Sequence, residues 1–69
     1  MKQEIVKALI HDAEAGRFIA EMDIKILLTN PVGVGDHANI LETIQLKLDE
    51  LAKHKDSLDV LGEYFYEED

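Results

Sequence analysis

Histidines placed one helical turn from a carboxylate are the residues of this sequence best suited to binding a metal. His11 precedes Glu14 by three residues, and Glu50 precedes His54 by four. Bundles that bind two iron ions use Glu-x-x-His pairs facing inward from two helices, together with further glutamates. Neither pair here has that order and spacing, and His11 falls on the polar edge of its helix. We therefore expect surface histidines and no metal site.

A Gly-x-Gly sequence, Gly33 and Gly35, precedes a helix, as phosphate-binding loops do. No strand comes before it, no lysine follows directly, and the next residue is the acidic Asp36, so the pattern favours a turn between helices. His37 begins the second helix, where the positive end of the helix dipole disfavours the charged imidazole. A neutral imidazole there could act as a base, but no nucleophile or second acid is near it. The sequence predicts no cofactor and no enzymatic activity.

One face of the second helix carries an acid at every seventh position. The acids are Glu42, Asp49, Asp56 and Glu63. Neighbouring members are about 10 Å apart along a helix axis, which is too far for them to bind one ion together. The acids are either a solvated face or a docking surface for a basic protein.

These residues must be positioned by two helices. Apolar and helix-forming residues continue over residues 2–29 and 37–65, and the breakers gather between them. Equal helices of about 42 Å joined by a short loop predict an all-α fold, an antiparallel hairpin in a single domain over residues 1–69. The acidic tail 66–69 opposes the helix dipole and should fray. The turn and the helix cap are assigned to Asn30, Pro31, Gly33, Gly35 and Asp36.

The apolar arc of the first helix is too wide for a single partner helix to cover. Its centre holds the small residues Ala13, Gly16 and Ala20, which allow close approach. One side of the arc is predicted to bind a second copy of the chain. The residues assigned to this self-association are Ile5, Ala15, Ile19, Met22 and Ile26. We expect a homodimer that closes a four-helix bundle, because a hairpin this small without disulfide or metal needs a partner.

The second helix has a narrower apolar seam with two interruptions, Lys55 and Gly62. The predicted members are Leu41, Ile44, Leu48, Leu51, Leu58 and Phe65. If the turn centres near Gly33, facing residues have numbers that sum to about 66. His54 then lies opposite Asp12, with Lys55 beside it, and these three form a predicted polar layer that sets the register.

The composition excludes several classes of protein. The 69 residues include no Cys, which excludes disulfides and thiolate sites. The formal net charge of −8 repels phosphate backbones and anionic lipid, so we expect no nucleic-acid or membrane partner. No apolar run approaches the roughly 18 residues that cross a membrane, and the N-terminus lacks the layout of a signal peptide. We therefore expect a cytoplasmic protein.

The stretch Leu28–His37, followed by Ile40, Glu42 and Ile44 and by Tyr64-Phe65, resembles short proteins encoded by marine tailed phages such as cyanophages. The distinctive part is the Asn-Pro-x-Gly-x-Gly turn between two helices. The resemblance implies a host bacterial cytoplasm and a role in phage infection. It implies no catalytic residues.

The sequence predicts a small acidic interaction protein that acts as a homo-oligomer and has no enzymatic activity. The alternative is an acidic inhibitor that imitates DNA and occupies a basic site on a host protein. The two differ in their response to salt and to competing DNA.

Overall fold

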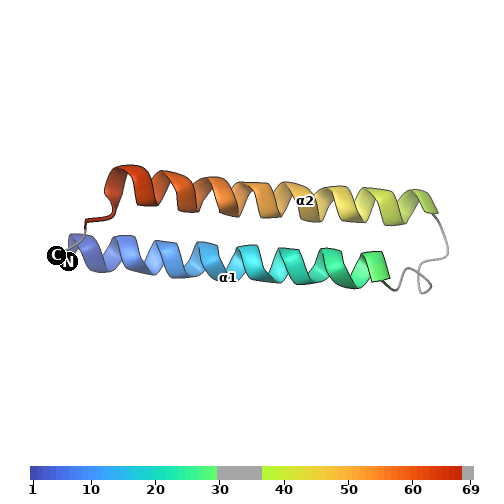
Figure 1. The fold of residues 1–69 in the computed structure, drawn as a ribbon, viewed down its shortest axis with the longest axis horizontal. Coiled ribbons are helices and arrows are strands. Elements are labelled where there is room, and N and C mark those ends of the chain that lie inside the picture. Colours follow the sequence, from blue (N-terminus) through green and yellow to red (C-terminus); the bar gives the residue numbers. More distant parts are fainter. Residues whose placement is uncertain (30–36, 68–69) are drawn as a thin grey trace.

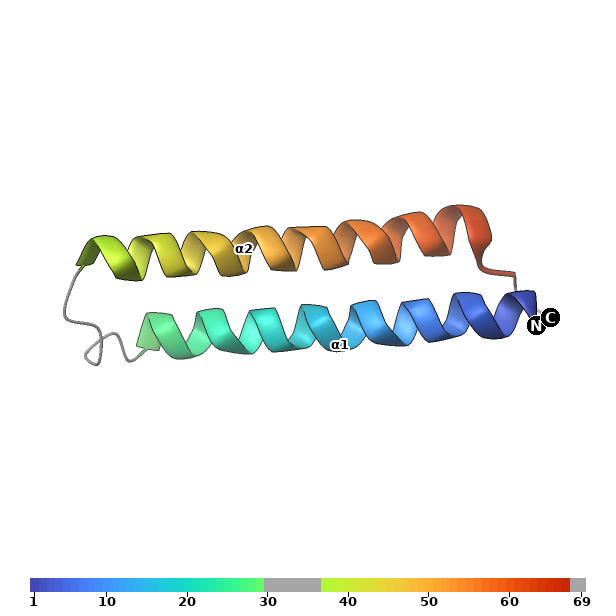
Figure 2. The same cartoon turned by 180° about the vertical axis from the view of Figure 1, so that it is seen from behind.

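Two antiparallel helices make up the computed structural model, which describes residues 1–29 and 37–67. Helix α1 spans Lys2–Thr29, and α2 spans His37–Val60 and continues into the π-helical turn η2, Leu61–Phe65. The helices lie side by side along a rod of 51 × 15 × 14 Å (Figures 1 and 2). The predicted all-α helical hairpin is confirmed. The four-helix bundle remains a prediction.

Helix α1 is stabilised by charges one turn apart on its own surface. Glu21 accepts contacts from Arg17 at 3.6 Å and from Lys25 at 3.1 Å. At the last turn, the Thr29 hydroxyl donates to the carbonyl of Lys25, one turn back along the helix, at 2.8 Å. These contacts are local and exposed, so each contributes only a few tenths of a kcal/mol.

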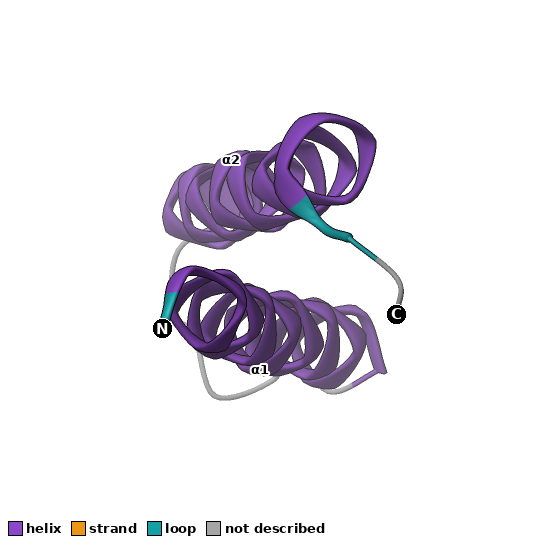
Figure 3. Cartoon of the chain, turned by 90° about the vertical axis from the view of Figure 1, so that its left-hand side faces the viewer, coloured by secondary structure: helices purple, strands orange, loops and turns teal. Residues whose placement is uncertain are grey.

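The contact between the helices is a single seam with heptad spacing, which we call the seam. On α1 it consists of Gln3, Val6, Ile10, Ala13, Arg17, Ala20, Ile24 and Leu27, and on α2 of Ile40, Ile44, Lys47, Leu51, His54, Leu58 and Leu61. All of these residues are buried or half-buried. Viewed along the rod, only one side of each helix faces the other (Figure 3). Two helices alone therefore leave most of their surface open.

The α2 side of the seam differs from the predicted one. The predicted members Ile44, Leu51 and Leu58 are present, but the other three are exposed: Leu41 at 70%, Phe65 at 50% and Leu48 at 42%. Helix α2 is rotated so that the neighbouring row, which contains the polar Lys47 and His54, faces α1. The rotation places each of these polar residues opposite a position on α1 that accommodates it.

The contacts that Lys47 and His54 make with α1 also define the register between the two helices. Lys47 Nζ lies 3.3 Å from an Asp23 carboxylate oxygen, and the His54 ring lies against Gly16. The numbers of both pairs sum to 70, whereas about 66 was predicted, so α2 is displaced by roughly one turn. The predicted centre of the turn, near Gly33, caused the difference. The turn itself, Asn30 to Asp36, lies outside the described residues.

The open end of the hairpin is held by Gln3. Its amide nitrogen donates to the carbonyl of Phe65 at 3.1 Å, and its amide oxygen accepts from the backbone N–H of Glu67 at 3.0 Å. Lys2 lies 3.8 Å from the Glu67 carboxylate. The helix ends at Phe65, as predicted, Tyr66 is extended, and Glu67 lies beside α1. The fraying of the tail remains a prediction. Residues 68–69 lie outside the described part of the chain.

Candidate functional site

The histidine–carboxylate pairs do not converge on a common point. His11 Nδ1 lies 3.3 Å from Glu14 Oε1 on the exposed side of α1, whereas His54 is half-buried between the helices. Glu50 contacts Lys47 at 3.5 Å. Among the described side chains, no three His, Asp or Glu residues come close enough together to hold a metal ion.

The sequence features around the turn are not part of the described structure. His37 is the first residue of α2, but its side chain is not described. The turn and cap residues Asn30, Pro31, Gly33, Gly35 and Asp36 fall in the gap between the two described ranges. Their predicted roles remain predictions.

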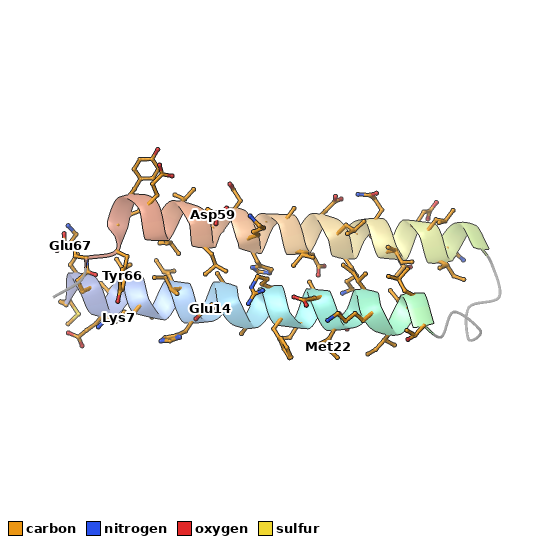
Figure 4. The ribbon with its side chains drawn as sticks, in the orientation of Figure 1. Lys7, Glu14, Met22, Asp59, Tyr66 and Glu67 are labelled. Carbon is orange, nitrogen blue, oxygen red and sulfur yellow. The ribbon has the colours of Figure 1, made fainter. Side chains whose placement is uncertain are left out.

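The most extensive candidate site is a second heptad row on α1, on the side away from α2. We call it the outer stripe, and its members are Met1, Ile5, Ala8, Asp12, Ala15, Ile19, Met22 and Ile26. Every member is exposed. All five residues assigned from the sequence to self-association belong to this row. Met22 points away from α2 in Figure 4.

The exposed fractions in the outer stripe are large for apolar side chains. Ile19 is 60% exposed, Ile26 56% and Ile5 54%. Single exposed apolar residues are ordinary, whereas a row of them along one helix is a candidate interaction surface. Asp12 is the only charged residue in the row, so the stripe is suited to apolar burial.

The predicted polar layer is wrong in its composition. Asp12 lies in the outer stripe instead of facing His54, and Lys55 is exposed and pairs with Asp59 on its own helix at 3.2 Å. His54 alone lies in the seam. The shift in register explains the error, because it moves Gly16 to the place where Asp12 was expected.

The polar contact that joins the helices, Lys47 with Asp23, was missed by sequence analysis. The hydrogen bond that Lys47 donates to the Asp23 carboxylate raises the pKa of Lys47 above its ordinary value of 10.5, and the nearby charge of Glu50 adds to the effect. The heptad spacing of Ile40, Lys47 and His54 was the available signal. The adjacent row with Leu41 and Leu48 is more apolar, and hydrophobicity therefore favours that row.

The acidic row on α2 is exposed over its whole length. Glu42, Asp49, Asp56 and Glu63 are all exposed, and Gln45 donates a hydrogen bond to Asp49 at 3.0 Å. Within the described residues, none of the four acids takes part in an ion pair. The row can therefore present uncompensated negative charge to a partner.

An open hollow lies beside Gly62 near the termini. Its walls include Lys7, Glu14 and Tyr66, which are labelled in Figure 4. The described residues contain no buried side-chain N or O atom without a hydrogen-bond partner. The hollow is thus a solvent-exposed groove without a preformed polar anchor for a ligand.

No helix in the described ranges has an apolar stretch long enough to cross a bilayer. In comparisons with known proteins, no family model, curated protein or solved structure matches the chain. The resemblance to phage proteins therefore remains an expectation from the sequence.

Proposed function

We propose that this chain is a small acidic interaction protein without enzymatic activity that works as a homo-oligomer, with the dimer as its basic state. The observation that carries the proposal is the outer stripe of α1. A continuous apolar row of this kind is unfavourable in water and favourable in contact with another apolar surface.

The small size of the core supports the same proposal. Among the residues whose burial is described, only five hydrophobic ones are buried, and two of them are alanines: Val6, Ala13, Ala20, Ile24 and Ile40. Chains of this length bury a small fraction of their surface and usually depend on a disulfide, a metal or a partner. The chain has no Cys, which leaves a partner as the simplest support.

Dilution tests the proposal directly. Helical content from circular dichroism and mass from sedimentation are measured on the full chain over a range of concentrations. We expect the two signals to fall together, because folding and association are linked. A helical monomer that stays folded at micromolar concentration would contradict the proposal.

A second candidate function is supported by the exposed acidic row of α2. Four exposed acids that form no ion pair with any described residue would suit a basic site on a host protein, as an inhibitor that imitates DNA requires. In that case the basic protein should be captured from a host lysate, released by competing DNA and released by moderate salt. Retention in the presence of both would favour the interaction protein without DNA mimicry.

A further inference from the structure

The outer stripe is a complete second heptad repeat on a helix that already uses one for α2. Its spacing alternates between four and three residues from Met1 to Ile26 without a break. Heptad rows of apolar residues are the pattern by which helices pack along their length. The question is which partner fits this row, and in which direction.

We propose that a second copy of the chain packs its own outer stripe against this one in antiparallel orientation, with facing residues whose numbers sum to 27. The proposal rests on the homo-oligomeric function proposed above and adds its direction and register. At this register every member of the stripe faces another member. The layers are Met1 with Ile26, Ile5 with Met22, Ala8 with Ile19 and Asp12 with Ala15, each formed twice around the two-fold axis.

The layers near the two-fold axis match large residues with small ones. Ala8 faces Ile19 of the second copy, so the small side chain leaves room for the large one. Asp12 faces Ala15, and its carboxylate can reach past the methyl group to solvent. The two Asp12 residues lie in adjacent layers about 4.5 Å apart along the axis in this register and in one layer in a parallel pair, so Asp12 does not select the orientation.

The charges that flank the stripe favour the same register. In an antiparallel pair of helices, the residues that flank the contact row of one helix lie near the flanking residues of the other helix. Opposite charges at these flanking positions favour the orientation and register that bring them together. Lys2 falls beside Asp23 of the second copy, and Glu4 falls beside Lys25. Within one chain the same four groups already form ion pairs with Glu67, Lys47, the Met1 amino group and Glu21, so the pairs between copies extend these contacts. Both pairs are of opposite sign and both occur twice, so charge complementarity argues for a second copy of this chain over an unrelated apolar partner.

The shape of the assembly follows from the angle between the two rows of α1. Outer-stripe residues Ala8, Ala15 and Met22 each follow a seam residue by two positions, which places the rows about 160° apart around the helix. A compact four-helix bundle would need the two contacts at roughly a right angle. The assembly is therefore a flat layer in the order α2, α1, α1 and α2, instead of the closed bundle expected from the sequence.

Disulfide trapping tests the register, because the natural chain contains no Cys. Full-length Ala8→Cys and Ile19→Cys chains are mixed, dissociated and refolded together, and then oxidised. We expect a disulfide-linked pair of the two variants as the main product, because only facing residues bring the two Cα atoms within about 7 Å. Ala8→Cys alone should not cross-link, because its two copies lie about 16 Å apart along the helices. Ala52→Cys, at an exposed alanine of α2, is the matched control with Ile19→Cys.

Each outcome supports or overturns a defined part of the proposal. Cross-linking of the mixed pair in chains that keep their helical content supports the register. If the chain is dimeric but Ala8→Cys links to itself, or the Ala52→Cys control links equally well, or no pair links, the register is wrong and the homo-oligomeric function stands. A folded monomer in sedimentation overturns both.

Discussion

The two heptad rows of α1 are similar in apolar content and differ in how well they are covered. Each row contains two alanines together with large apolar residues, such as Ile10 and Ile24 in the seam and Ile19 and Ile26 in the outer stripe. The seam residues are buried or half-buried against α2, whereas the residues of the outer stripe stay exposed. Burying a large apolar side chain contributes about 1.5–3 kcal/mol, so the outer stripe holds potential stabilisation that the single hairpin does not use. The comparison teaches that the hairpin contact uses one of two similar rows and leaves the other available for a further contact.

The substitution expected to have the largest effect on stability and association is Ile19→Glu. A carboxylate in the outer stripe removes apolar burial and places an unpaired charge in the proposed interface, at a cost of about 3 kcal/mol or more. We expect loss of the dimer and of helical content together, measured by sedimentation and circular dichroism at the same concentration. Leu41→Glu is the control, because Leu41 is 70% exposed and belongs to neither row. Equal losses in both variants would show that the outer stripe has no special role.

The seam is tested by two glycine substitutions that are expected to change the free energy of unfolding in opposite directions. A Cβ on Gly16 would lie 2.5 Å from ring atoms of His54, whereas a Cβ on Gly62 meets nothing within 4 Å. We expect Gly16→Ala to lower the free energy of unfolding by about 1–2 kcal/mol, since the clash outweighs the gain in helix propensity. Gly62→Ala should be neutral or stabilising by up to about 1 kcal/mol.

Chemical denaturation of both variants, and of Gly16→Ala combined with His54→Ala, checks this expectation. The Gly16→Ala penalty should largely disappear once the ring is removed. If Gly16→Ala is as stable as Gly62→Ala, the helices are not as close at this layer as described.

The all-α hairpin was predictable from the sequence because two long helical stretches flank a cluster of breakers. The uncovered side of α1 was predictable as well, since its apolar arc exceeds what one helix covers. The rotation of α2 about its own axis was not predictable from the sequence. Leu41 and Leu48 form a more apolar row than Lys47 and His54, so hydrophobicity alone favours the wrong row. The deciding contacts, Lys47 with Asp23 and His54 against Gly16, exist only once the register is known.

The ion pair across the seam gives a smaller and pH-dependent effect. The pKa of Lys47 is raised in the folded chain by Asp23, so the stabilisation is fully present below the ordinary lysine pKa of 10.5 and is lost as the pH rises through the folded value. Asp23→Asn should lower the Lys47 pKa, measured by NMR titration of the side chain. The same substitution should reduce stability at neutral pH by less than Gly16→Ala does, and added salt should shrink the difference. An unchanged Lys47 titration would show that the contact does not persist in solution.

The smallest expected effect on stability belongs to the acidic row of α2. Reversing two charges, Asp49→Lys with Asp56→Lys, should change the free energy of unfolding by less than about 0.5 kcal/mol and leave the mass in sedimentation unchanged. Both side chains are exposed and make no ion pair among the described residues. Binding to a basic protein, if the row serves that purpose, should be lost. If the double variant instead becomes monomeric, α2 must take part in the contact between copies of the chain.

Because the chain reverses once, residues near its two ends lie side by side at one end of the rod (Figure 1), where Gln3 holds Phe65 and Glu67. A force applied between the termini would therefore load the seam one layer at a time, from Gln3 inward, and would never load all layers in shear. The hairpin should unzip at low force under such a pull. A force that draws two chains apart along α1 would meet the eight layers of the proposed contact together. The same molecule would then be mechanically weak within one chain and resistant between chains, a directional difference that single-molecule pulling could resolve.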